Sequence, residues 1–178
     1  IGVNAKPDER TLREVYLMGF EAAVKEGDVY SIMGAYNQYN GTNANQSHHL
    51  VREILKGEWG FDGVLLTDWH VDINTYDAAV NGLDLEMGTD VESYSQYFLA
   101  DPFLAMIKSG EIAESILDDK VRRILRLQHR VGLMDENRLA GERNTAKHQQ
   151  AARKIAEEGV VLLKNTHVNN APVLPLKV

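Results

Sequence analysis

Asp68 is the side chain of this sequence that is best placed to do chemistry. It comes directly after an apolar run at 64–67 and directly before Trp69. A carboxylate in that position can attack the anomeric carbon of a sugar, and an indole beside it can cover the apolar face of the ring. The same aspartate could instead cap the helix that follows, because Asp side chains often accept hydrogen bonds from the first amides of a helix. The local pattern supports both roles equally.

A divalent metal is the alternative at the same place. An Asp-x-His-x-Asp spacing runs from Asp68 to Asp72 and could ligate a metal for hydrolysis. Metal sites in barrels usually take ligands from several strands, however, and two adjacent histidines would point in different directions if they opened a helix. The spacing therefore permits a metal hydrolase without requiring one. The full candidate set is His48, His49, Asp68, His70 and Asp72.

Helices and strands alternate on both sides of Asp68. Apolar residues at 11–25 recur at helical spacing, and Thr11 with Glu14 matches a capping box at the start of that helix. Compact apolar runs at 29–33 and 64–67 are too short for helices and predict buried strands. The other elements expected here are helices at 50–59 and 73–80, a turn at Asn40-Gly41 and a third strand at 82–87.

This alternation predicts the fold class. Strands that alternate with helices at least three times indicate an α/β fold with parallel strands. The pattern fits a parallel sheet or a (β/α)8 TIM-type barrel; a closed eight-stranded barrel usually needs roughly 250 residues, so about half a barrel would be present. Catalytic groups of such barrels sit at the C-terminal ends of strands. Those ends are expected at Tyr36 and Asn37, at 68–70, and at Asp84 and Glu86.

The rest of the chain predicts the end of this unit and the start of another. Helices are expected at 93–108, despite Pro102, and at 112–130, where Gly132 closes the second one. A helix at 147–158 and a strand starting at Val160 follow a polar, irregular stretch. The expected domains are a partial barrel at 1–134, a linker at 135–146 and the start of a second domain at 147–178.

Composition narrows the class of partner. The 178 residues carry a net charge of −7 with both signs interleaved, which argues against nucleic acid and against an anionic membrane surface. A neutral, polar substrate fits better. Cysteine is absent, which excludes disulfides, thiolate metal sites and a cysteine nucleophile. The chain opens on Ile1 and Gly2, so we expect a processed piece or a chain that begins within a domain.

Several segments along nearly the whole chain resemble glycoside hydrolase family 3, the β-glucosidase type. The most specific are EWGFDG at 58–63 and TDW at 67–69, which are similar to the family's nucleophile motif, usually written with serine where Thr67 stands. The others are ERTLREVYL at 9–17, MGAYN at 33–37, GLDLEM at 82–87, EGVVLLKN at 158–165 and LPL at 174–176. The last two resemble the entry to the family's second, α/β-sandwich domain.

The resemblance implies a function and a set of site residues. It implies a retaining β-glycosidase that hydrolyses terminal non-reducing β-D-glucosyl residues, such as those of cello-oligosaccharides, through a covalent glycosyl-aspartate intermediate. Asp68 is then the nucleophile, and Met33, Tyr36 and Trp69 bind the non-reducing-end sugar. No metal and no cofactor are implied. A secreted or periplasmic protein is favoured.

Two alternatives stay open within and beyond this chemistry. A β-xylosidase or arabinofuranosidase of the same family is possible because the residues that choose between hexose and pentose mostly lie outside this chain. A non-catalytic fragment that only binds sugar or a complementary chain is an alternative from a different class.

The departures from the family pattern predict that the chain is incomplete. The family's earlier barrel strands and its general acid/base glutamate have no counterpart here. Retaining hydrolysis needs two carboxyl groups about 5 Å apart, and only Asp68 is identified; the family pattern gives Glu86 no catalytic role. We therefore expect the isolated chain to be inactive. Its expected partner is the remaining part of the enzyme, the front half of the barrel and the acid/base-bearing domain, which another chain could supply.

Overall fold

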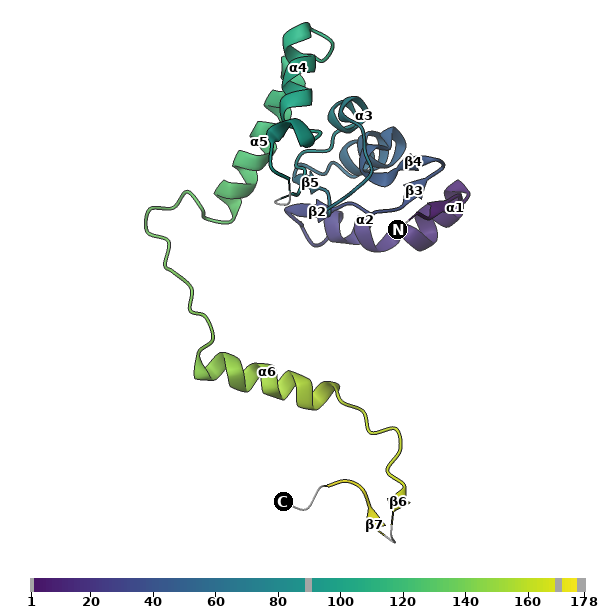
Figure 1. The fold of residues 1–178 in the computed structure, drawn as a ribbon, viewed down its shortest axis with the longest axis vertical. Coiled ribbons are helices and arrows are strands. Elements are labelled where there is room, and N and C mark those ends of the chain that lie inside the picture. The colour runs from purple at the N-terminus through teal and green to yellow at the C-terminus, as the bar shows by residue number, and fades with distance from the viewer. Residues whose placement is uncertain (1, 89–90, 169–170, 176–178) are drawn as a thin grey trace. The chain divides into compact units, whose positions relative to one another are not determined.

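The computed structural model describes residues 2–88, 91–168 and 171–175. The chain divides into two compact units, Ile1–Glu136 and Asn137–Val178 (Figure 1). Each unit is described by itself. The first combines helices with short strands, as the alternating pattern predicted, and it contains all the residues that the sequence singled out for chemistry.

The first helical stretch starts earlier than predicted. It consists of α1 (Glu9–Thr11), the π-helical η1 (Leu12–Tyr16) and α2 (Met18–Lys25). The N-cap is Asp8, whose Oδ1 accepts a hydrogen bond of 2.7 Å from the amide of Thr11. The predicted capping box at Thr11 and Glu14 is therefore wrong. Thr11 lies inside the helix, because an aspartate three residues earlier already satisfies a free amide of the first turn.

Parallel pairing joins the two strands that the apolar runs predicted. Strand β2 (Ser31–Met33) pairs with β5 (Val64–Leu66), with Ile32 opposite Leu65. The predicted third strand at 82–87 makes a single parallel bridge, between Leu66 and Leu85. Both strand predictions are thus confirmed in their central residues, and the third element follows β5 without forming a regular ladder.

A second sheet has three strands of two residues each. Its strands are β1 (Asn4–Ala5), β3 (Gln38–Tyr39) and β4 (Thr42–Asn43), in the order β1-β3-β4. The turn between β3 and β4 is the predicted Asn40-Gly41, with φ of 50° and 87°. Two consecutive residues with positive φ fit a tight hairpin turn, in which asparagine and glycine are favoured.

Helices cover this framework. They are η2 (Ala44–Gln46), η3 (His48–Glu58), α3 (Thr75–Val80), η4 (Tyr94–Gln96), α4 (Asp101–Ser109) and α5 (Glu114–Arg130). The predicted single helix at 93–108 is wrong, because it is split into η4 and α4. Pro102 lies in the first turn of α4, the one part of a helix where a missing amide hydrogen costs little.

The core of the first unit forms around β5. Its two buried clusters are Val51, Leu55, Phe61, Leu65, Val71, Ile73, Ala78 and Leu83, and Ala79, Phe103 and Ile112. Helix α5 is held against the chain that leads into β5. The guanidinium of Arg123 donates to the carbonyls of Phe61 and Gly63, both at 3.0 Å. Arg130 adds a two-pronged ion pair to Asp62 at 2.7 and 2.8 Å. The chain that enters β5 is therefore fixed by arginines.

Within its described residues, the second unit contains a helix and a pair of short antiparallel strands. Helix α6 (Ala146–Gly159) is capped by Thr145, and β6 (His167–Val168) pairs with β7 (Ala171–Pro172). The strand predicted to start at Val160 is not formed, and residues 160–163 have exposed side chains. A strand needs a hydrogen-bonded neighbour, and in the described part of this unit none pairs with these residues. Among the residues described, no helix is long and apolar enough to cross a membrane.

Lys120 of α5 is a cation enclosed by the first unit. It is 4% exposed, and its ammonium donates to the backbone carbonyls of Ala79, at 2.8 Å, and of Leu83. Burial disfavours the charged form and lowers the pKa of Lys120 from 10.5 to about 8. The folded protein therefore releases this proton at a lower pH than the unfolded chain does.

This pKa difference predicts how stability changes with pH. Between about pH 8 and 10.5 the unfolded chain holds more protons at Lys120 than the folded one, so the free energy of unfolding should rise with pH. Relative to Lys120→Met, the gain should approach about 3 kcal/mol. Urea unfolding at pH 7.5, 9 and 10.5 measures it, with Lys108→Met, a change at an exposed site, as the control. A stability difference that does not vary with pH would contradict the prediction.

Candidate active site

Asp68 lies just beyond the C-terminal end of β5. Thr67 between them is 1% exposed; its amide donates to the carbonyl of Leu85 at 3.1 Å, and its hydroxyl accepts from the amide of Met87 at 2.9 Å. The backbone before Asp68 is thus fixed on the neighbouring segment. Asp68 itself is only partly buried, so its carboxylate is held at its base and accessible at its tip.

The role of Asp68 as a helix cap is excluded by the structure. The following helix, α3, is capped by Asn74, whose side chain accepts from the amide of Asp77 at 2.8 Å. Asp68 Oδ1 accepts instead from the amide of its own neighbour Trp69, at 2.7 Å. Of the two roles that the local pattern allowed, only the one that leaves the carboxylate near the strand end agrees with these contacts.

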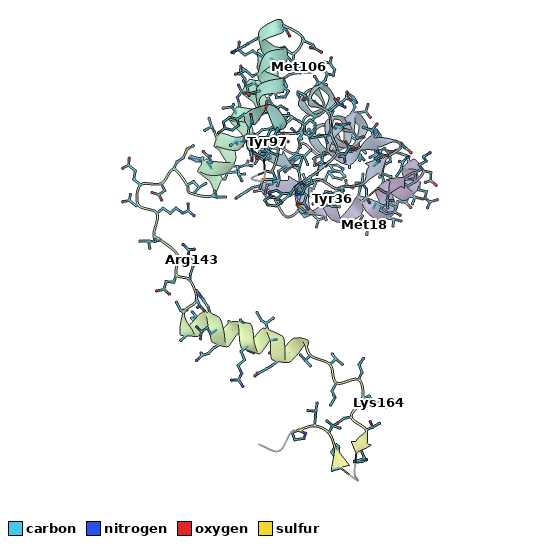
Figure 2. The ribbon with its side chains drawn as sticks, viewed as in Figure 1. Met18, Tyr36, Tyr97, Met106, Arg143 and Lys164 are labelled. Atoms are coloured by element: carbon cyan, nitrogen blue, oxygen red, sulfur yellow. The ribbon has the colours of Figure 1, made fainter. Side chains whose placement is uncertain are left out.

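Tyr36 (labelled in Figure 2) lies on the loop after the neighbouring strand, and its phenol comes near the Asp68 carboxylate. It follows β2, and the parallel pairing of β2 with β5 brings both strand ends to one edge of the sheet. Loss of hydration raises the pKa of the Tyr36 phenol above its usual value, and the hydrogen bond to Asp68 and the charge of that carboxylate raise it further. The phenol therefore stays protonated beside the Asp68 carboxylate.

Two asparagines that the sequence did not single out hold the Tyr36 loop in place. Asn45 is fully buried, and its amide nitrogen donates to the carbonyl of Ala35 at 2.9 Å. Asn43 donates to the carbonyl of Tyr36 at 3.2 Å. A Cβ on Gly34 would lie 1.8 Å from Asn45 Oδ1, so the loop requires glycine there. The signal in the sequence was a run of amide side chains after a strand, which by itself resembles an ordinary polar loop.

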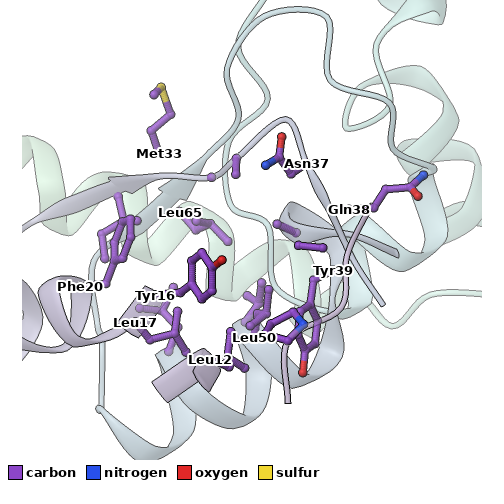
Figure 3. Close-up of a pocket in the computed structure, with 18 of the residues that line it drawn as sticks. Leu12, Tyr16, Leu17, Phe20, Met33, Asn37, Gln38, Tyr39, Leu50 and Leu65 are labelled. Atoms are coloured by element: carbon purple, nitrogen blue, oxygen red, sulfur yellow. The ribbon is translucent and has the colours of Figure 1, made fainter. Parts of the chain in front are cut away.

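Met33 and Trp69 expose much of their side chains. Met33, the last residue of β2, is 55% exposed and Trp69 is 39% exposed. Figure 3 shows the Met33 side chain pointing away from Phe20 and Leu65, which lie on the other side of the strand. Both side chains are thus available to a ligand, and their part in sugar binding stays a prediction.

A cavity of about 110 Å³ lies beside Asp68. The polar residues that line it include Thr67, Asp68, His70, Glu86, Gln96 and Tyr97. Glu86 Oε2 accepts a hydrogen bond of 2.8 Å from the amide of Leu99, so this carboxylate holds the following loop. The third predicted strand end thereby contributes to the wall of the cavity.

The candidate metal ligands are not brought together. His48 and His49 both contact Glu53 on the same helix, at 3.3 and 2.5 Å, and His49 also contacts Glu9 at 3.0 Å. The hydrogen bond with Glu53 is the main cause that raises the pKa of His49. The set of His48, His49, Asp68, His70 and Asp72 does not form a site, and the described residues hold no group of three or more such ligands with suitable geometry.

The chain resembles known proteins along almost its whole length. It is 40% identical over 180 residues to the β-glucosidase BoGH3A of Bacteroides ovatus, covering 97% of this chain and 24% of that protein. It is 38% identical over 177 residues to β-glucosidase B of Emericella nidulans, covering 98% of this chain and 20% of that protein. The chain therefore spans a quarter or less of the length of these relatives.

The chain also resembles solved structures of β-glucosidases. β-Glucosidase 3B from Thermotoga neapolitana, in complex with glycerol, superposes with a TM-score of 0.76 at 34% identity, covering 98% of this chain and 24% of that one. DesR, a β-glucosidase from Streptomyces venezuelae in complex with D-glucose, gives 0.79 at 32% identity, with coverages of 92% and 22%. Residues 2–127 match the profile described as the glycosyl hydrolase family 3 N terminal domain. The chain belongs to glycosyl hydrolase family 3.

Proposed function

We propose that this chain is the nucleophile-bearing part of a retaining β-glucosidase, with Asp68 as the attacking carboxylate. The observation that carries the proposal is the pairing of Asp68 with Tyr36. The two residues follow the ends of adjacent parallel strands, and the Asp68 carboxylate lies near enough to the Tyr36 phenol to raise its pKa. A half-buried carboxylate held at one edge of a parallel sheet suits an attack on a substrate that sits above that edge.

The proposed framework is a partial (β/α)8 barrel. The parallel pair β2–β5 and the bridge from Leu66 to Leu85 are the order expected of three successive barrel strands. Family membership supports this architecture. The domain limits of 1–134, 135–146 and 147–178 belong to the same proposal.

The proposed chemistry has two steps. An oxygen of Asp68 attacks C1 of the sugar, the glycosidic C–O bond breaks, and the leaving oxygen takes a proton from an acid outside this chain. Water then attacks C1, gives its proton to the same outside group, and releases Asp68 as a carboxylate. The hydrogen bond from the Trp69 amide restricts the orientation of Asp68, and the Tyr36 phenol lies near the same carboxylate, so less of its conformational freedom is lost at the moment of attack.

The proposed substrate is a terminal, non-reducing β-D-glucosyl residue. The relatives described above are named β-glucosidases, which favours glucose over a pentose. We propose that the exposed Trp69 indole and Met33 contact the sugar, because an aromatic face packs well on the apolar face of a pyranose ring. Tyr36 would lie between them, at the nucleophile.

The proposed active form includes protein beyond this chain. Helical residues of the first unit expose large apolar side chains, with Val15 66%, Tyr16 59% and Met18 63% exposed. An apolar hollow of about 250 Å³ runs beside them and is lined by Leu12, Phe20 and Leu65 among others (Figure 3). Such a surface marks a place where further protein packs. The missing barrel strands and the acid-bearing domain are the proposed partners.

Replacing the nucleophile tests the function directly. In the catalytically complete protein, Asp68→Asn keeps the shape of the side chain but removes its charge, so kcat should fall at least about 10²-fold while glucose still binds. Turnover of an aryl β-glucoside and glucose titration measure the two effects. Asp72→Asn, an exposed site four residues on, is the matched control and should be near normal. Near-normal turnover in Asp68→Asn would rule out Asp68 as the nucleophile.

The Tyr36–Asp68 contact predicts a change in a tyrosine titration. In Asp68→Asn the pKa of Tyr36 should fall toward 10, because a neutral amide no longer opposes the phenolate. NMR of ¹³Cζ-labelled tyrosine follows it, and Tyr36→Phe assigns the signal. Tyr39, whose pKa is raised first by burial and then by Glu9, should titrate as before. An unchanged pKa of Tyr36 would show that the two side chains do not interact.

The isolated chain should not react. An activated 2-fluoro sugar, which accumulates the glycosyl-enzyme, should label Asp68 in the complete enzyme and leave the purified 178-residue chain unlabelled, because the latter lacks the acid and the remaining strands. Peptide mapping by mass spectrometry locates the label. Efficient labelling of the monomeric chain would show that these residues already contain a sufficient site.

A further inference from the structure

A buried cluster of charged side chains lies beside β5, the strand that precedes Asp68. Its centre is Asp84, whose side chain is 0% exposed. The ammonium of Lys56, on η3, lies 2.7 and 2.8 Å from the two carboxylate oxygens of Asp84 and also donates to the carbonyl of Gly82 at 2.6 Å. Arg123 of α5 approaches the same carboxylate at 3.9 Å. Two helices therefore place cations at one carboxylate.

Asp84 binds both backbone groups of Leu65 in β5. Its Oδ2 accepts from the amide of Leu65 at 2.8 Å, and its own amide donates to the carbonyl of Leu65 at 3.0 Å. In a regular parallel ladder a backbone carbonyl would accept from that amide. Here a carboxylate oxygen takes the place of the backbone carbonyl, so the hydrogen bond to the Leu65 amide depends on which side chain stands at position 84.

Two lysines also satisfy backbone carbonyls that a regular strand ladder would pair. The carbonyls of Gly82 and Leu83 accept from the ammonium groups of Lys56 and Lys120. Buried backbone groups without partners are costly, and these two are satisfied by side chains from η3 and α5. The segment before Leu85 is thus held beside β5 by charged side chains in addition to the backbone hydrogen bond from the Asp84 amide to Leu65.

The same segment continues to the nucleophile. One residue after Asp84, the carbonyl of Leu85 accepts from the amide of Thr67, and two residues further on Met87 donates to the Thr67 hydroxyl. Asp68 follows Thr67 directly. A shift of the Asp84 segment along β5 would therefore move the backbone that carries Asp68.

We infer that Asp84, held by Lys56, is a positioning residue that sets the place of the Asp68 carboxylate through Leu65 and Thr67. The inference rests on the proposed function of Asp68. Asp84 does not act on the substrate; it fixes the register of the segment on which the end of β5 rests. Burial lowers the pKa values of Lys56 and Lys120, so loss of the one enclosed carboxylate would leave two unfavourably buried cations, and the segment would rearrange.

The test separates the rate of nucleophilic attack from the fraction of folded sites. The catalytically complete protein is labelled with an activated 2-fluoro glucoside, and both the rate constant and the final amplitude of labelling at Asp68 are measured. In Asp84→Asn the rate constant should fall about 10- to 100-fold, the loss expected when a reacting group is misplaced by about 1 Å. The amplitude and the affinity for glucose should stay at wild-type values.

Lys56→Met supplies a second variant in case Asp84→Asn does not fold. It keeps a side chain of similar length but removes the donor to Asp84 and Gly82, so the rate constant should again fall. Asp119→Asn is the matched control, because this variant also removes a carboxylate that pairs with Arg123, at 2.9 Å. The Asp119 side chain, however, is 39% exposed. Its labelling should match that of the wild type.

Each outcome decides between the alternatives. A native rate constant with reduced amplitude in the Asp84 or Lys56 variant would show a merely structural role and overturn the inference. So would an equal loss of rate in Asp119→Asn. If the wild-type protein is not labelled at Asp68, the proposed function fails and this inference fails with it. If the wild type is labelled and both variants react normally, only the inference is lost.

Discussion

The parallel pairing of β2 with β5 is the constraint on which the candidate site depends. Met33 lies opposite Leu66 in this register, so the chain leaves both strands at the same edge and in the same direction. Tyr36 and Asp68 can therefore meet within three residues of the strand ends. A slip of one residue would turn alternate side chains to the opposite face of the sheet, and the phenol would no longer reach the carboxylate.

The first unit satisfies its interior backbone with an unusual share of polar side chains. Asn43 and Asn45 hold the loop after β2, and Asp84 with Lys56 holds the segment beside β5. A regular ladder would do this with less loss of hydration, since burying charged groups is costly even when they are paired. In return, side chains of fixed length and shape allow only one arrangement. The polar interior thus favours precision over stability at the strand ends that carry the chemistry.

Sequence patterns predicted the elements whose cause is local. The apolar runs at 29–33 and 64–67 became β2 and β5, and the Asn40-Gly41 turn was found where it was expected. The prediction of one helix through Pro102 failed because proline lacks an amide hydrogen and fits only the first turn of a helix, so α4 begins anew at Asp101. The capping box predicted at Thr11 and Glu14 is not formed because the Asp8 side chain caps the helix one turn earlier.

The parts of the site that the sequence did not reveal depend on contacts between distant residues. Asp84 was recognised as a strand end, but its partner Lys56 lies 28 positions away on a helix. Lys120 is 41 positions from the carbonyl of Ala79 that it binds. Local spacing cannot distinguish a buried lysine from an exposed one on an amphipathic helix, because the stem of the side chain is apolar in both cases.

The two ends of β5 are held in different ways, and the difference explains where chemistry can occur. At its entry, Arg123 and Arg130 of α5 saturate the carbonyls and carboxylate of 61–63. At its exit, Thr67 is held on the neighbouring segment through its amide and its hydroxyl, while Asp68 and Trp69 remain partly exposed. A carboxylate at the entry would be neutralised by the arginines of α5, as Asp62 is. Only at the exit is a charge anchored at its base and left accessible, which is the condition that a nucleophile requires.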